Sequence, residues 1–205
     1  MKVLILYYSL FGNTFKMAQA VAQGVKSVAG AEASLMRVPE LMPKEIIEGN
    51  EKMKMALAAQ KDIPVAKIED LAKFDAIIFG SPTRFGNMCS QMKNFLDQTG
   101  GLWMKGALVG KPAGVFACTA TIHGGQETTL VSMMMPLLHH GMIIVGVPYS
   151  VPELTTTKSG GTPYGPTAVV GAMADQPPTE IDLTIAQALG KRVAEITSKL
   201  TCCSK

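Results

Sequence analysis

The chain has 205 residues, of which 47% are apolar and 17% are charged, and its formal net charge is +3. A chain of this length buries a core without help from disulfides or metals, so we expect one globular domain. The positive charge comes from scattered lysines that form no basic stripe, which argues against a nucleic-acid-binding protein.

The start of the chain and its cysteines bear on location and on metal binding. The apolar run Val3–Tyr8 is too short for a signal peptide or a membrane-spanning helix, so we expect a cytoplasmic protein with no integral membrane segment. The cysteines are Cys89, Cys118, Cys202 and Cys203. They show no C-x-x-C spacing, so we predict no metal site and no disulfide framework, and we interpret the last two as inert residues of the tail.

Five short apolar runs predict the strands of a sheet. In chain order they are Val3–Tyr8, Ala33–Val38, Ala76–Phe79, Ala113–Ala117 and Met142–Val147. The runs are nearly continuous rather than alternating, as expected of strands that are buried on both faces.

Helical patterns lie between these runs. Met17, Val21, Val25 and Val28 recur at spacings of 4, 4 and 3, which predicts a helix with one buried stripe. We expect further helices over residues 90–99, ended by Gly100 and Gly101, over residues 127–140, ended by Gly141 as a left-handed cap, and over residues 183–200.

Strands that alternate with helices predict an α/β fold with right-handed crossovers and a parallel sheet that has helices on both faces. Five strands favour the doubly wound, flavodoxin-like order 2-1-3-4-5. We predict a single domain over residues 1–200 and a tail over residues 201–205. Two segments exceed this minimum: a partly helical excursion at about residues 39–66, and a loop rich in Gly, Pro and Thr at about residues 148–178. A loop of that length is usually functional or covers a partner surface.

In such a sheet, ligands bind beyond the carboxyl ends of the strands, and three loops fall there. The first comprises Ser9, Leu10, Phe11, Gly12, Asn13 and Thr14. Its hydroxyls, its glycine and the free N–H groups of a helix start can form a nest for a phosphate. It matches neither G-x-x-x-x-G-K-[ST] nor G-x-G-x-x-G, which favours a single phosphomonoester, as in FMN. The alternative is an ordinary turn in which Asn13 or Thr14 caps the helix.

The second loop comprises Ser81, Pro82, Thr83, Arg84, Phe85, Gly86 and Asn87. Proline stiffens this loop and glycine allows a tight turn. Arg84 and Phe85 place a cation and a ring on the ligand side, as the rim of a flavin site requires. The alternative is a surface turn whose Phe85 packs into the core.

The third loop comprises Cys118, Thr119, Ala120, Thr121, Ile122, His123, Gly124 and Gly125. Its two glycines let the backbone approach a flat ligand closely. A nucleophilic pair of Cys118 and His123 is the alternative, and the expected burial of Cys118 at a strand end argues against it.

Three further side chains have two interpretations each. His139 and His140 end a predicted helix, where the macrodipole favours an imidazolium. They are either an electrostatic cap or a positive group beside the N1 and O2 edge of a flavin. Trp103 is either a plug in the core or an exposed stacking surface.

Six sequence blocks carry a resemblance to a known family. They are Leu6–Ser9 with Phe11 and Gly12, Phe79–Met88, Phe95–Trp103, His123–Glu127, His139–Met142 and Gly160–Gly165. With these blocks the chain resembles the WrbA-type NAD(P)H:quinone oxidoreductases, a tetrameric branch of the flavodoxin-like fold. The resemblance runs from Val3 to about Leu200.

The resemblance implies an FMN-dependent enzyme that moves a hydride from NADH or NADPH to flavin N5 and then reduces a quinone by two electrons. One stacking pocket for both substrates implies ping-pong kinetics. The chemistry belongs to the flavin, so no side chain is predicted to be catalytic. The resemblance also implies a homotetramer, built as a dimer of dimers.

The resemblance assigns roles to individual residues as well. Ser9, Leu10, Phe11, Gly12, Asn13 and Thr14 would hold the FMN phosphate, and Pro82, Thr83, Arg84, Phe85 and Gly86 would line the isoalloxazine with Asn87 nearby. Cys118, Thr119, Ala120, Thr121, His123 and Gly124 would bond the ribityl chain and the ring edge, and His139 would reach the pyrimidine end. Trp103 would wall the substrate pocket at a subunit interface. Phe11 would stack at the nicotinamide site, where the family commonly has a tyrosine.

Two rival functions stay open at this point. One is an electron carrier that binds FMN without turning over a small substrate, although such flavodoxins are typically strongly acidic. The other is an oligomeric scaffold with a vestigial flavin site. The sequence assigns no preference between NADH and NADPH, because the loops contain no clear partner for a 2′-phosphate.

Overall fold

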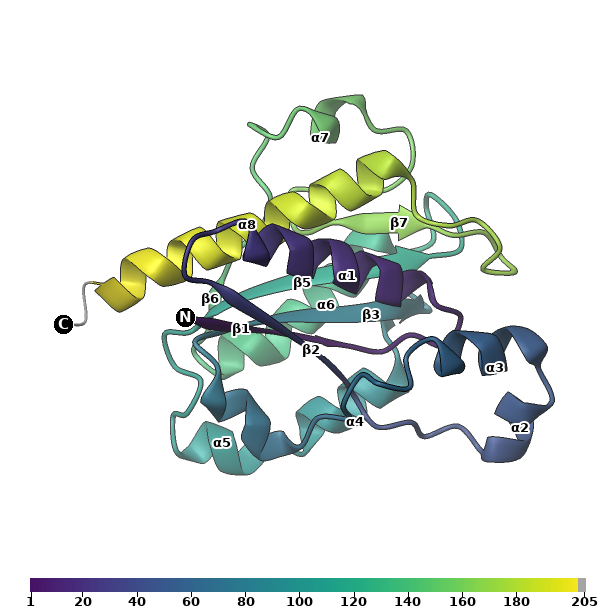
Figure 1. Cartoon of the computed structure of the whole chain (residues 1–205), viewed down its shortest axis with the longest axis horizontal. Coiled ribbons are helices and arrows are strands. Elements are labelled where there is room, and N and C mark those ends of the chain that lie inside the picture. The colour runs from purple at the N-terminus through teal and green to yellow at the C-terminus, as the bar shows by residue number, and fades with distance from the viewer. Residues whose placement is uncertain (203–205) are drawn as a thin grey trace.

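The computed structural model describes residues 1–202 (Figure 1). Its strands are β1 (Lys2–Tyr7), β2 (Glu32–Arg37), β3 (Ala76–Arg84), β4 (Asn87–Met88), β5 (Pro112–Thr119), β6 (Ile143–Ile144) and β7 (Thr167–Val169). Its helices are α1 (Asn13–Lys26), α2 (Lys44–Glu48), α3 (Glu51–Ala58), the 3-10 helix η1 (Ile68–Lys73), α4 (Ser90–Asp97), α5 (Gly100–Met104), α6 (Gln126–His139), α7 (Glu153–Thr156) and α8 (Glu180–Cys202). Of the two cysteines predicted to be inert, Cys202 is exposed at the end of α8, and Cys203 lies outside the described residues.

The main path of the sheet has the order β2-β1-β3-β5-β6, and all of its neighbours are parallel. This confirms the predicted order 2-1-3-4-5. The expected number of five strands was incomplete, because β4 pairs antiparallel with β3, and β7 pairs parallel with β5. Both additional strands are two or three residues long, too short to show a pattern in the sequence.

The strand at the β5 edge is interrupted. β6 pairs with Pro112 and Ala113 at the start of β5, whereas β7 pairs with residues 117–119 at its end. The run predicted over Met142–Val147 is therefore a strand only at Ile143–Ile144. The chain leaves the edge there, because the N–H of Val147 donates to the carbonyl of Pro163 instead of to β5. The predicted long loop supplies α7 and then returns to the edge as β7.

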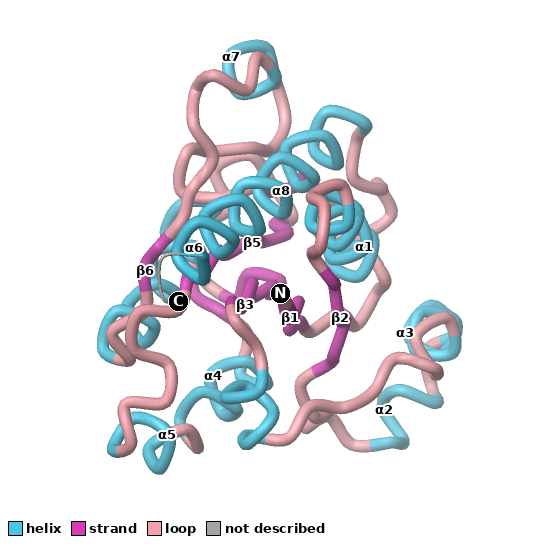
Figure 2. Tube along the Cα trace, turned by 60° about the vertical axis from the view of Figure 1, so that its left-hand side comes forward, coloured by secondary structure: helices cyan, strands magenta, loops and turns pink. Residues whose placement is uncertain are grey.

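Helices cover both faces of the sheet, as the sequence predicts (Figure 2). Successive residues of β1 point to opposite sides. Val3, Ile5 and Tyr7 pack in one cluster with α1 and α8, and Leu4 and Leu6 pack in the other with α4 and α6. All five residues are fully buried, which explains the continuous apolar run in the sequence.

Two glycines let α1 and α8 approach closely. A Cβ atom on Gly24 of α1 would lie 1.9 Å from the carbonyl oxygen of Gln187, and one on Gly190 of α8 would lie 2.0 Å from that of Val21. Each helix therefore presents a glycine to the backbone of the other. This contact closes the cluster that buries one face of the sheet.

The remaining helices follow the predictions with one correction. α6 ends as expected, with Gly141 in the left-handed region at a φ of 72°. The excursion contains α2 and α3 and is partly helical as predicted. Gly100 and Gly101 do not simply break a helix, because α4 ends at Asp97 and the glycines begin α5. Among residues 1–202, no helix combines the length and hydropathy needed to cross a bilayer.

We expect the substitution Gly190→Ala to lower the free energy of unfolding by about 1–3 kcal/mol, because the new methyl group overpacks the contact between α1 and α8. Urea unfolding followed by circular dichroism measures the change. Gly100→Ala is the matched control, since a Cβ atom there meets nothing within 4 Å. Equal destabilisation by the two variants would contradict a special role for the helix contact.

Candidate functional site

A cleft opens at the carboxyl edge of the sheet, where all three predicted loops meet. Its lining includes Ser9, Leu10, Phe11, Asn13 and Thr14 of the first loop, Pro82, Thr83 and Arg84 of the second, and Cys118, Thr119 and Ala120 of the third. The cavity volume is about 130 Å³. This is below the roughly 300–1,000 Å³ of sites that enclose a whole small molecule, so the larger part of a bound cofactor would lie at the mouth.

The first loop has the properties of an anion site. Gly12 takes the left-handed conformation at a φ of 88°, and no side chain caps α1. The N–H of Phe15 donates to Ser9 Oγ at 3.1 Å, but the N–H groups of residues 11–14 find no acceptor among residues 1–202. The first turn of α1 contains no acidic residue. Unpaired N–H groups at the positive end of a helix dipole suit a phosphate.

A buried glutamine that the sequence analysis missed holds this loop in place. Gln60 is fully buried after α3, and its amide donates to the carbonyls of Ser9 at 3.1 Å and Ala56 at 2.7 Å. The excursion thus anchors the first loop through this side chain. One polar residue in a segment with many charged residues gave no signal of this contact.

Most of the predicted second loop is strand, because β3 continues to Arg84, and the loop is reduced to a tight hairpin turn between β3 and β4. Phe85 and Gly86 both have positive φ angles, 52° and 77°, as in a type I′ turn. The alternative in which Phe85 packs into the core is wrong, because its side chain is fully exposed. A non-glycine residue held in this region, with its ring in solvent, is a feature that clusters at functional sites.

The third loop packs against the second. A Cβ atom on Gly125 would lie 2.7 Å from the Cα of Gly86, so the two loops meet through their glycines. Burial raises the pKa of the Cys118 thiol to about 12. Cys118 is therefore a protonated wall residue at neutral pH, which argues against the nucleophile alternative.

A fourth segment completes the cleft and was not predicted as part of it. Val170, Gly171, Ala172 and Ala174 line the wall beside the first loop. Asn13 Nδ2 donates to the carbonyl of Ala174 at 3.0 Å, and the N–H of Val170 donates to the carbonyl of Thr119. The segment follows β7, so it would have been found at the carboxyl edge if β7 had been predicted.

Several predicted site residues do not line the cleft of this single chain. They are Gly12, Phe85, Gly86, Asn87, Thr121, His123, Gly124, Trp103 and His139. Most of these lie in the three loops at or beyond the rim. Trp103 and His139 are the exceptions, since they lie together at the opposite end of the sheet.

The separation of Trp103 and His139 from the cleft follows from the direction of α6. This helix leaves the carboxyl edge at Gln126 and runs back for 14 residues, which is about 20 Å. It ends where the carbonyl of Gly141 accepts from the N–H of Gly110, just before β5 begins. Trp103 Nε1 donates to the carbonyl of His139 at 3.0 Å, and the tryptophan is 58% exposed. The interpretation of Trp103 as a core plug is therefore wrong.

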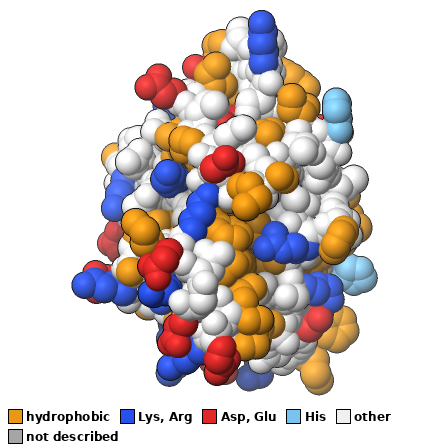
Figure 3. All heavy atoms as spheres, turned by 90° about the vertical axis from the view of Figure 1, so that its right-hand side faces the viewer, with side chains coloured by type: hydrophobic (Ala, Val, Ile, Leu, Met, Phe, Trp, Pro, Cys, Tyr) orange, Lys and Arg blue, Asp and Glu red, His pale blue; other side chains and the backbone are white. Residues whose placement is uncertain are grey.

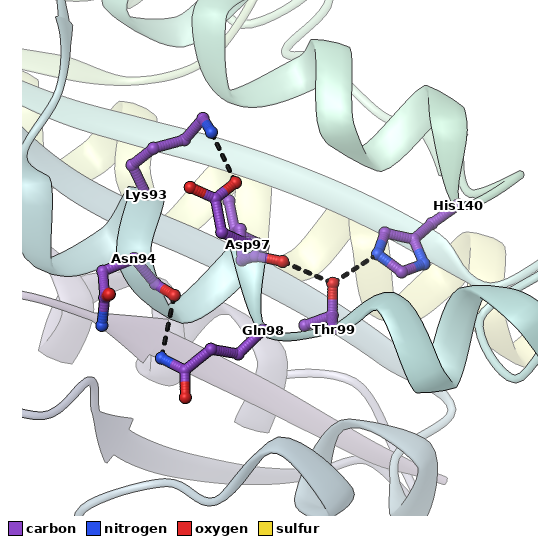
Figure 4. Close-up of polar contacts among 7 residues, drawn as sticks. Lys93, Asn94, Asp97, Gln98, Thr99 and His140 are labelled. Carbon is purple, nitrogen blue, oxygen red and sulfur yellow. Dashed lines mark hydrogen bonds and ion pairs between the residues drawn. The ribbon is translucent and has the colours of Figure 1, made fainter.

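His140, unlike His139, is buried and holds the corner between α4 and α6 (Figure 4). Its Nε2 lies 2.7 Å from Thr99 Oγ1, and the Thr99 hydroxyl donates to the carbonyl of Leu96 at 2.6 Å. The hydroxyl proton is thereby used, so Nε2 must carry the hydrogen and donate it. Nδ1 has no partner among residues 1–202. Burial, and secondarily His139, hold the pKa of His140 below its usual value.

The model of a protein family described as NADPH-dependent FMN reductase matches residues 1–155. The chain belongs to this family. The match covers the three predicted loops and stops before β7 and α8. The resemblance on which the site roles were based is thus confirmed at the level of the family.

Full-length relatives extend this comparison. The chain is 53% identical to a protein of Aromatoleum aromaticum over 202 residues, which cover 98% of this chain and 97% of the relative. It is 55% identical to a protein of Trichlorobacter lovleyi over 98% of both chains. Each of these relatives is named NAD(P)H dehydrogenase (quinone). Among solved structures, a WrbA-like flavodoxin of Agrobacterium tumefaciens has a TM-score of 0.63 at 26% identity, covering 97% of this chain and 98% of its own.

We expect the stability of the protein to fall as the pH drops below 6.5, in part because of His140. A folded-state pKa below the unfolded value means that the unfolded chain binds more protons in this window, so the free energy of unfolding decreases with falling pH. His140→Asn removes this titration. Urea unfolding between pH 7.5 and 5.5 should show wild type losing stability faster than the variant, and parallel curves would contradict the assignment.

Proposed function

We propose that this protein is an FMN-dependent NAD(P)H:quinone oxidoreductase. The observation that carries the proposal is the set of unpaired N–H groups at the start of α1, in a turn without an acidic residue. Such a turn binds one phosphate monoester, and the three other segments around it leave an open mouth for a flat ring. The names of the relatives, which match over nearly their whole lengths, support the same reaction.

The side chains of the cleft would bind and orient FMN, which, when bound, accepts a hydride and passes two electrons to the quinone. Thr14 and the first turn of α1 would hold the phosphate. The walls at Thr83 and Thr119 would keep water away from the ring edge, and Phe85 would cover the ring at the rim. Because donor and acceptor would use the same face of the ring in turn, ping-pong kinetics follow.

We further propose a homotetramer in which a second copy completes each cleft. The support is an apolar stripe on the exposed face of α6, made of Val131, Met135 and Leu138 at helical spacing. Trp103 and Met104 extend this stripe and are 58% and 81% exposed. Contiguous exposed apolar surface of this kind is typical of subunit contacts. It would bring Trp103 and His139 of one copy to the rim of another.

We also propose a cytoplasmic location, where reduced nicotinamide cofactors are available. Cys89 and Cys118 are buried and form no disulfide, as is usual for proteins of a reducing compartment.

The purified protein is expected to bind FMN and to lose the yellow absorption of the flavin on anaerobic addition of NADH or NADPH. Subsequent benzoquinone should restore that absorption. Thr14→Val should weaken FMN binding by about tenfold, because a hydroxyl that can bond the phosphate is lost. Thr184→Val, on the exposed side of α8, is the matched control.

Two outcomes of this titration would overturn the proposal in different directions. A yellow protein that neither dinucleotide bleaches would point to the electron carrier. A colourless protein that takes up no added FMN would point to the scaffold with a vestigial site.

Met135→Glu should break the proposed tetramer into smaller species, because it places a charge in the apolar stripe of α6. Sedimentation velocity measures the assembly. Quinone turnover should fall with it, because Trp103 of a second copy no longer reaches the cleft. Ile46→Glu on α2 is the control, since Ile46 is comparably exposed but lies away from the stripe. A tetramer that survives Met135→Glu would exclude this face as the contact.

A further inference from the structure

Two grooves of nearly equal size include residues of the loops predicted to form the site. The first, of about 480 Å³, lies between α1 and α3 and is lined by Phe11, Phe15, Lys16, Lys52 and Met55, among others. The second, of about 470 Å³, lies beside α6 and includes Asn87, Glu127, Val131 and Tyr164. Size does not distinguish the two grooves, but charge does.

The first groove has two lysines available for an anion. Neither Lys16 nor Lys52 forms an ion pair within the part of the chain that the structure describes. Glu51, the acidic neighbour of Lys52 in the chain, is paired with Lys54 at 2.7 Å. The second groove has the carboxylate of Glu127 and no lysine or arginine in its lining. A ligand with several negative charges would therefore be attracted to the first groove and repelled from the second.

The first groove is continuous with the cleft. Phe11 lines both cavities, and Lys52 Nζ lies 5.9 Å from the centroid of its ring. The same ammonium donates to the carbonyl of Met173 at 2.6 Å, between the cleft residues Ala172 and Ala174. Lys52 thus stands at the border of the two cavities. On this face of the molecule, apolar side chains gather near the centre, with lysine or arginine side chains on either side (Figure 3).

The chemistry of the electron donor matches this arrangement. In NADH and NADPH, the reacting nicotinamide is joined through a pyrophosphate to an adenosine. If the nicotinamide stacks at the mouth of the cleft beside Phe11, the rest of the molecule must run along the adjoining surface. Phe15 and Met55 offer an apolar wall for the adenine, and the two lysines offer cations for the phosphates.

We propose that the groove between α1 and α3 binds the phosphorylated adenosine half of NADH or NADPH, with Lys16 and Lys52 neutralising its phosphates. This inference rests on the proposed function. It assigns a place on the protein to the part of the donor that takes no part in hydride transfer. Phe11 then marks the point where the dinucleotide passes from the cleft into the groove.

The test uses FMN-loaded protein and the single variants Lys16→Ala and Lys52→Ala. Each should raise the KM for NADH and for NADPH by about threefold to tenfold, the usual effect of one exposed charge-assisted contact. The kcat should not change, because the lysines would contact a part of the dinucleotide that takes no part in hydride transfer. The KM for benzoquinone should not change, because the dinucleotide leaves before the quinone binds. Lys26→Ala is the matched control, since Lys26 is an exposed lysine at the other end of α1.

Two probes separate this inference from the proposed function. The first, 1-benzyl-1,4-dihydronicotinamide, has no phosphate and should bleach the flavin equally fast in all variants. The second, ADP-ribose, has no nicotinamide, and calorimetry should show it binding to wild type and about threefold to tenfold more weakly to the lysine variants. Lysine variants that match wild type in both KM and ADP-ribose affinity would overturn the inference while leaving the proposed function intact. ADP-ribose binding that depends on both lysines, in a protein that oxidises no dihydronicotinamide, would instead overturn the proposed function alone.

Discussion

The parallel register of β1, β3 and β5 is the constraint from which the site follows. Tyr7, the last residue of β1, lies opposite Gly80, and β3 and β5 continue side by side beyond this level, with Pro82 opposite Cys118. The loops after these strands converge at one edge, where the N–H groups of residues 11–14 find no acceptor among residues 1–202, as suits the phosphate of a cofactor.

The segments beyond the minimum fold stabilise that edge. Gln60, at the end of the excursion, bonds the backbone of Ser9, and Asn13 bonds the backbone of Ala174 in the segment after β7. The first loop is therefore held on two sides by chain that is distant in sequence. A loop positioned in this way loses little entropy when a ligand binds, because most of its ordering has already occurred on folding.

The parts of this structure that could be predicted are those that leave a local signal. Continuous apolar runs such as Ile77–Phe79 identify buried strands. Gly141 marks the end of α6, because the residue at this position has a left-handed backbone conformation, which glycine adopts most easily. β7 gave no such signal, because a strand of three residues is too short to show a periodicity. The segment around it is rich in Gly, Pro and Thr. The position of Phe85 depends on a turn whose conformation is imposed by the pairing of strands in the sheet. The sequence alone therefore left two positions open for its ring, one in the core and one at the rim of the cleft. The site roles of Trp103 and His139 were assigned by resemblance. In a single chain both residues lie far from the cleft, so a second copy of the chain would have to bring them to it.

The interrupted strand beside β5 affects the tendency of this protein to aggregate with other copies of itself. An exposed edge with a long row of free N–H and C=O groups is a template on which another chain can add a strand. Here that edge is split into a two-residue and a three-residue piece, with residues 145–166 looping outward between them. Neither piece offers enough consecutive backbone groups for a foreign strand to pair. The segment that interrupts this strand and leads the chain to the rim of the cleft therefore also protects this side of the sheet from aggregation.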